Sequence, residues 1–132
     1  MNFVRTALLA TLAPAALAGL FGTAPALAHP RLLSAQPAAG ASVAKPTRIA
    51  LAFSEKLVAQ MSGMDVVMTG MPGMANHAPM KMGGFKTALD KDGKTLVATF
   101  ARALPAGTYQ VQWHVVSVDT HRVEGRVAFT VK

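Results

Sequence analysis

Short runs of alternating apolar and polar or small residues dominate this chain. A period of two is the pattern of a β-strand that buries one face, and about seven such segments can be distinguished. Pro and Gly residues separate the runs, as turns between short strands require. The predicted strands cover residues 31–36, 49–53, 65–69, 85–89, 96–100, 109–115 and 127–131. No run has the length and period of a normal helix, so we expect an all-β fold, an antiparallel sandwich or a small barrel.

The same alternation predicts which side chains form the core. In the clearest run, Tyr109 to Val115, apolar residues occupy one face, while Gln110, Gln112 and His114 occupy the other. His114 is therefore interpreted as a surface histidine outside any metal site. The large residues expected inside are Phe53, Leu96, Phe100, Val111, Trp113 and Phe129.

The first 28 residues have the pattern of a secretory signal peptide. Arg5 precedes an alanine-rich apolar run from Ala7 to Ala24, and Ala26-Leu27-Ala28 matches the small-x-small site of a signal peptidase. We expect cleavage after Ala28, export to the periplasm, and one mature domain over residues 29–132, which is enough chain for one small core. Later segments are too short or too polar to span a bilayer.

Composition narrows the chemistry of such an exported domain. The chain has no cysteine, so neither disulfides nor thiolate ligands are available to it. Its formal charge is +7, and loss of Arg5 with the leader leaves +6, from 12 basic and 6 acidic residues. The basic residues are spread singly and form no run interleaved with aromatic residues, which argues against a nucleic-acid partner.

Seven of the eight methionines lie between Met61 and Met82, and the eighth is Met1. Methionines that only filled core gaps would be scattered over all strands. Thioether sulfur is soft and uncharged, and it suits Cu(I) rather than Zn²⁺, Ca²⁺ or Mg²⁺. Pro and Gly accompany these residues, so we expect a methionine-rich surface loop over about residues 61–82, with one histidine, His77. The segment from Met71 to Met82 lacks strand alternation, so we expect it to lie on the surface and to be poorly ordered without metal.

Two further patterns suggest a site for Cu(II). Cleavage after Ala28 would make His29 the first residue, so that its α-amine and imidazole could chelate one metal ion, and Pro30 has no amide N–H to compete. Asp119 and His121 are two residues apart and would project from the same side of an extended segment. Amine, imidazole and carboxylate form the nitrogen and oxygen ligand set that tetragonal Cu(II) prefers.

These features together resemble the CopC family of periplasmic copper-binding proteins, also called copper resistance protein C or PcoC-like. The resemblance extends over the whole chain after the leader. Its blocks are residues 29–37 (HPRLLSAQP), 53–55 (FSE), 67–74 (VMTGMPGM), 106–109 (AGTY) and 113–125 around Asp119 and His121. The resemblance implies a seven-stranded Greek-key sandwich or barrel of the immunoglobulin or cupredoxin-like kind, without enzymatic activity. It also implies two separate copper sites at opposite ends.

Carried over residue by residue, the resemblance assigns the ligands. Cu(II) would be held by His29, Asp119 and His121, with Glu55 as a further carboxylate whose role stays open. Cu(I) would be held by three or four ligands at a time, drawn from Met68, Met71, Met74, His77 and Met80. His77 is one residue further from Met74 than in the family pattern, and Met61, Met64 and Met82 are extra methionines that either surround the site or pack.

The expected function is copper binding, buffering and delivery in the periplasm, for copper resistance or homeostasis. The expected partner is a membrane copper transporter or another component of a resistance or cuproenzyme system, and the expected state is a monomer, with a metal-bridged dimer also open. Two alternatives remain. One is a copper oxygenase-like enzyme built on an N-terminal histidine chelate, although eight aromatic residues offer no evident sugar platform. The other is a structural or adhesion sandwich, which leaves the methionine clustering unexplained.

Overall fold

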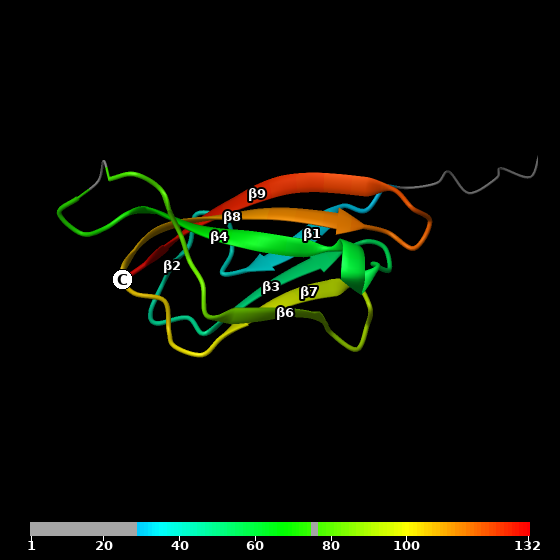
Figure 1. The fold of residues 1–132 in the computed structure, drawn as a ribbon, viewed down its shortest axis with the longest axis horizontal. Helices are drawn as coiled ribbons and strands as arrows, with labels where there is room; N and C mark the ends of the chain where they lie inside the picture. Colours follow the sequence, from blue (N-terminus) through cyan, green and yellow to red (C-terminus); the bar gives the residue numbers. More distant parts are fainter. Residues whose placement is uncertain (1–28, 75–76) are drawn as a thin grey trace, which may run out of the picture.

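The structure, a computed structural model, describes residues 29–74 and 77–132, which form two β-sheets packed face to face (Figure 1). The four-stranded sheet has the order β1–β3–β7–β6, and the five-stranded sheet has the order β2–β9–β8–β4–β5. The strands are β1 (Leu32–Gln36), β2 (Ser42–Val43), β3 (Arg48–Phe53), β4 (Gly63–Gly70), β5 (Met80–Lys81), β6 (Phe85–Leu89), β7 (Thr95–Phe100), β8 (Gly107–Val116) and β9 (Arg122–Val131). Because the two sheets stay separate, the fold is a sandwich and not a closed barrel.

All seven predicted strands are present, and two more accompany them. The additional strands, β2 and β5, have two residues each, which is too short for an alternating pattern to be recognised. Strand β9 is longer than expected because its polar first half pairs with β8 in unbroken register, from Arg122 opposite Val116 to Val131 opposite Gly107. The described residues contain no α-helix and one short 3₁₀ helix, η1 (Ala59–Met61).

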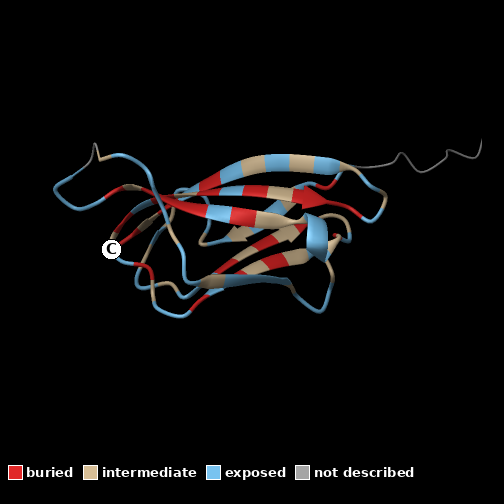
Figure 2. Ribbon diagram, in the orientation of Figure 1, coloured by how far each residue is buried: buried red, intermediate tan, exposed pale blue. Residues whose placement is uncertain are grey.

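The core lies between the two sheets, where buried and exposed positions alternate along the strands (Figure 2). All six large residues predicted for the core are buried, Trp113 being the most exposed of them at 7%. The Trp113 ring lies 5.0 Å from that of Phe53, edge to face, and joins the two sheets. Its other side rests on Gly125, since a Cβ placed there would lie 2.2 Å from Trp113 Cζ2. A side chain at position 125 would therefore displace the indole.

Tyr109 is buried, and its hydroxyl is bonded to the loop that precedes β8. The Tyr109 hydroxyl donates a hydrogen bond of 2.6 Å to the carbonyl of Pro105, four residues upstream, as in the tyrosine corner of immunoglobulin-like sandwiches. Its ring stacks on Phe129 of the neighbouring strand at 5.4 Å. Burial raises the pKa of this hydroxyl. Over residues 29–74 and 77–132, no helix is both long and apolar enough to cross a membrane.

Candidate functional site

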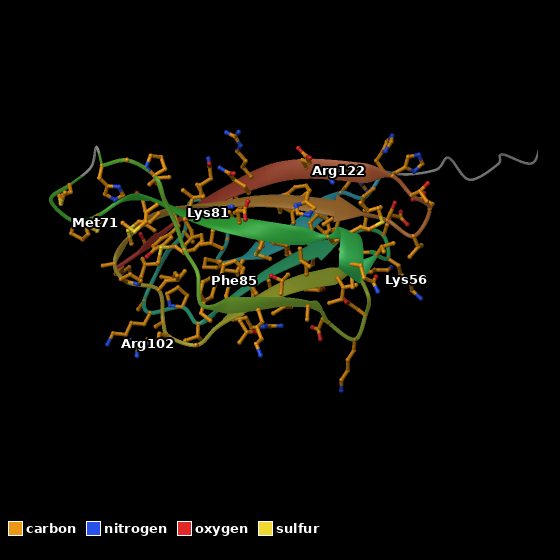
Figure 3. The ribbon with its side chains drawn as sticks, viewed as in Figure 1. Lys56, Met71, Lys81, Phe85, Arg102 and Arg122 are labelled. Atoms are coloured by element: carbon orange, nitrogen blue, oxygen red, sulfur yellow. The ribbon has the colours of Figure 1, made fainter. Side chains whose placement is uncertain are left out.

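The two predicted metal sites lie at opposite ends of the sandwich. Strand β8 connects the two ends. Near its start, Thr108 pairs with Gly70, next to Met71, and the strand ends at Val116, where the β8–β9 turn begins. Eight residues of extended chain span about 27 Å. In Figure 3, Met71 accordingly lies at one end of the molecule, and Lys56 and Arg122 lie at the other.

The β8–β9 turn brings Asp119 and His121 together. Asp119 Oδ2 lies 3.2 Å from His121 Nδ1, and both side chains are about one-third exposed. The Ser117 hydroxyl donates a hydrogen bond to the other carboxylate oxygen, Oδ1. That bond is the main cause of the lowered pKa of Asp119, and His121 contributes less. The carboxylate is therefore ionised at neutral pH and available to a cation.

His29 meets this turn from the other sheet. Its ring lies 4.6 Å from the ring of His121, edge to face. Pro30 is fully buried, and the next residue is fixed by two hydrogen bonds: Arg31 N–H donates to Ser54 Oγ, and Ser54 N–H donates to the Arg31 carbonyl, each at 2.9 Å. The start of the described chain is thus anchored beside His121, although 92 residues of sequence separate the two histidines.

Glu55 lies in the chain between a residue bonded to the segment after His29 and a residue bonded to the β8–β9 turn. The residue before it is hydrogen-bonded to Arg31, and the residue after it, Lys56, accepts a 3.0 Å hydrogen bond from the amide of Val118. Leu57 and Ser117 form an antiparallel bridge directly beyond. Glu55 is half-buried at the same end as Asp119. No contact joins its carboxylate to either histidine in the described part of the chain.

One ring nitrogen of His121 has no partner. Nδ1 is buried, and it forms no hydrogen bond even though Asp119 Oδ2 lies 3.2 Å away. A buried ring nitrogen without a hydrogen-bond partner is available to bind a ligand. Among residues 29–74 and 77–132, no three His, Cys, Asp or Glu side chains converge as a complete metal-binding group. The α-amine of a processed His29 would add a ligand that the full chain, where this nitrogen is in a peptide bond, does not offer.

The methionines do not form one loop, and the predicted bounds of 61–82 are wrong. Residues 63–70 are strand β4, and Met64 and Met68 point inward from it, with 6% and 3% exposure. Both belong to the core cluster. Within the segment from Met71 to Met82, Met80 and Lys81 form strand β5 against β4. A two-residue edge strand leaves no trace in the sequence pattern.

Strand pairing instead places the methionines in two opposed pairs. Met68 and Met80 are direct partners across β4 and β5, so their side chains emerge on the same face, about 5 Å apart at Cβ. Met71 and Met74 face each other across a Pro-Gly turn closed by a 2.9 Å hydrogen bond from Met74 N–H to the Met71 carbonyl. Gly73 has φ 78° at the turn position that requires it. Met71, Met74 and Met80 are 36%, 54% and 51% exposed.

His77 also has a ring nitrogen without a partner. Its Nδ1 lies 2.6 Å from the carbonyl of Ala78, and its Nε2 is buried without a hydrogen bond. A carbonyl at Nδ1 selects the tautomer that carries its proton there, which leaves the Nε2 lone pair free for a metal ion. The described residues contain three such buried side-chain atoms, and two of them are imidazole nitrogens of histidines predicted to bind copper; the third is Trp113 Nε1.

The remaining candidates lie apart from both clusters. Met61 is exposed on η1, and Met82 is half-buried against the core. His114 faces outward from the five-stranded sheet, paired with Gly63 and Glu124, which agrees with its interpretation as a surface histidine. The sequence analysis overlooked Ser117, which is 1% exposed and contacts Asp119. Its position two residues before the D-x-H pair was the available signal.

Comparison with known proteins places the chain in a family. The CopC domain model matches residues 32–132. Copper resistance protein C of Pseudomonas syringae pv. tomato is 50% identical over 117 residues, covering 87% of this chain and 90% of the relative. Copper resistance protein C of Escherichia coli is 48% identical over 107 residues, covering 81% and 84%.

A solved structure extends the agreement to the fold. The crystal structure of PcoC, a methionine-rich copper resistance protein from Escherichia coli, superposes with a TM-score of 0.72 at 46% identity, covering 80% of this chain and 100% of PcoC. The family model covers both the residues at the β8–β9 turn and the paired methionines. The chain therefore belongs to the CopC family.

Proposed function

We propose that this protein binds copper in the periplasm and carries it in two sites, one for Cu(II) and one for Cu(I), as part of copper resistance or homeostasis. The observation that carries the proposal is the pair of unpartnered imidazole nitrogens, one at each end of the sandwich. Each lies among ligands suited to a different oxidation state of the same metal. The names of the relatives, copper resistance proteins, support binding and not catalysis.

The Cu(II) site would consist of the His29 α-amine and imidazole, Asp119 and His121. The 3.2 Å approach of Asp119 Oδ2 to His121 Nδ1 and the 4.6 Å separation of the two rings support a shared metal, because a copper ion placed there would relieve the orphaned nitrogen. Glu55 would contribute a second carboxylate or hold the amine. Such a site assembles only when the leader is removed.

The Cu(I) site would draw its ligands from Met71, Met74, His77, Met80 and Met68. Exposed thioethers on a turn can exchange stepwise with the ligands of an incoming protein, which suits transfer better than storage. Met68 differs from the others because it is buried, so it would take part only as the inner wall of the site, beside Met80. We propose a membrane copper transporter or another resistance or cuproenzyme component as the recipient.

The proposal is tested by titrating the processed protein separately with Cu(II) and with Cu(I), each against a competing chelator. One equivalent of each ion should bind independently. A form with one additional residue before His29 should bind Cu(II) much more weakly, with a changed EPR spectrum, and should bind Cu(I) as before. Equal Cu(II) affinity and identical spectra in the two forms would refute the role of the α-amine.

A further inference from the structure

We infer that Ser117 is a positioning residue for Cu(II): its hydroxyl holds the Asp119 carboxylate, and its main chain holds His121, so that both ligands are presented in a preformed arrangement. The inference rests on the proposed Cu(II) site and adds a residue that binds no metal itself. With the carboxylate held in this way, the turn would offer a single carboxylate oxygen to the ion.

The burial of Ser117 is the first observation. It is 1% exposed and is the one buried residue with a non-aromatic polar side chain in the part of the chain that the structure describes. A buried hydroxyl without a partner costs free energy, whereas alanine would fill the position without that cost. The bridge to Leu57, in the segment between β3 and β4, already fixes the backbone of Ser117. The hydroxyl thus extends from a rigid strand end and not from the turn itself.

The hydrogen bonds around Ser117 define its role. Its amide N–H donates to the His121 carbonyl at 2.9 Å, and its own carbonyl accepts from Thr120 N–H at 2.8 Å. Its hydroxyl lies within reach of two acceptors, Asp119 Oδ1 and, at 3.3 Å, the His121 carbonyl. A hydroxyl has one proton, and the charged carboxylate is the stronger acceptor. Oδ1 is therefore occupied by Ser117, while Oδ2 is directed to His121 Nδ1.

This division of the carboxylate has a consequence for the metal. With Oδ1 bound to the hydroxyl, Asp119 is set to ligate through Oδ2 alone, beside the orphaned nitrogen of His121. Without the hydroxyl, the carboxylate could rotate and bind in more than one way. Groups that orient metal ligands in this manner typically change metal affinity about 10- to 100-fold when they are removed.

The same turn supplies a matched control. Thr120 also has a hydroxyl, which donates to the main-chain carbonyl of Asp119 at 2.6 Å and forms no hydrogen bond with the carboxylate. Thr120→Ala therefore removes a hydroxyl from the turn without freeing the Asp119 side chain. Comparing it with Ser117→Ala separates orientation of the ligand from closure of the turn.

The experiment uses processed protein and compares Cu(II) affinity and the Cu(II) EPR spectrum in wild type, Ser117→Ala, Thr120→Ala, Asp119→Asn and the double variant Ser117→Ala/Asp119→Asn. Ser117→Ala should bind Cu(II) at least tenfold more weakly with an altered spectrum, and Thr120→Ala should resemble wild type. Because Ser117 acts through the carboxylate, Ser117→Ala should have no further effect once Asp119 is Asn. Cu(I) affinity and the melting temperature show that each variant is folded.

Three results would overturn the inference. A wild-type spectrum and affinity in Ser117→Ala would show that the hydroxyl does not position the ligand. An equal loss in Thr120→Ala would assign the effect to the turn as a whole, and additive losses in the double variant would show that Ser117 acts independently of Asp119. If wild type itself bound no Cu(II), the proposed function would fail and this inference with it, which is a different outcome from weak binding confined to the variant.

Discussion

The two kinds of methionine in this protein should respond to mutation in opposite ways. Met68 is 3% exposed, and its methyl lies where a side chain on Gly107 would meet it at 3.3 Å. Replacing it with alanine removes three heavy atoms from a packed core, which typically costs about 2–5 kcal/mol. Met71, Met74 and Met80 are between 36% and 54% exposed, and substitutions at such positions usually cost under about 0.5 kcal/mol each.

These magnitudes translate into melting temperatures that are easily resolved. For a domain of about 100 residues, 1 kcal/mol corresponds to roughly 4–8 °C. A loss of about 3 kcal/mol in Met68→Ala therefore lowers the melting temperature by roughly 12–24 °C. The triple variant Met71→Ser/Met74→Ser/Met80→Ser should stay within about 1.5 kcal/mol of wild type, because the hydrogen bonds of the Met71–Met74 turn involve the main chain and are retained.

Both variants are melted without metal, followed by circular dichroism, and then titrated with Cu(I) against a chromophoric chelator. The triple variant should melt near wild type and lose Cu(I) binding, while its Cu(II) binding persists. Met68→Ala should be strongly destabilised, and its folded fraction should lose less Cu(I) affinity than the triple variant, because Met71, Met74, His77 and Met80 remain. A triple variant that melts far below wild type and still binds Cu(I) would refute the reasoning, because the exposed methionines would then act as structural residues.

Three further predictions follow from individual contacts. Gly125→Ala should destabilise the fold by about 3 kcal/mol in a thermal melt, because its Cβ would lie 2.2 Å from Trp113; an unchanged melting temperature would contradict the packing described. His121→Ala should abolish tight Cu(II) binding and leave Cu(I) affinity unchanged, and a loss of both in parallel titrations would argue against separate sites. The pKa of Asp92 is lowered, chiefly by a hydrogen bond from the Lys94 amide, so its stabilising contribution is complete above about pH 4 and disappears as the pH falls through the folded-state pKa. Denaturant melts should therefore show Asp92→Asn destabilised near neutral pH and approaching wild type in acid, and a pH-independent difference would exclude this linkage.

The sequence by itself determined the fold class and the core, and it predicted the chemistry of the two candidate sites. Alternation with a period of two depends only on which face of a strand is buried, so the seven longer strands and the six large core residues were predictable. The absence of cysteine and the concentration of methionine restricted the metal to one that accepts thioethers. The D-x-H spacing predicted that Asp119 and His121 share a side of an extended segment; they do lie together, 3.2 Å apart, but in the β8–β9 turn, where Thr120 has φ 74°.

Contacts between distant segments were decided only by the tertiary structure. Whether a methionine packs in the core or stays exposed depends on where its strand lies. Met68 and Met80 are paired on the same face, but Met68 on β4 is buried, whereas Met80 on the edge strand β5 is exposed. His29 reaches His121 because the chain around Arg31 is bonded to Ser54, a contact that no local pattern encodes. Ser117 is a similar case: a serine is unremarkable in sequence, and only its burial and its bridge to Leu57 make its hydroxyl a fixed donor to the Asp119 carboxylate.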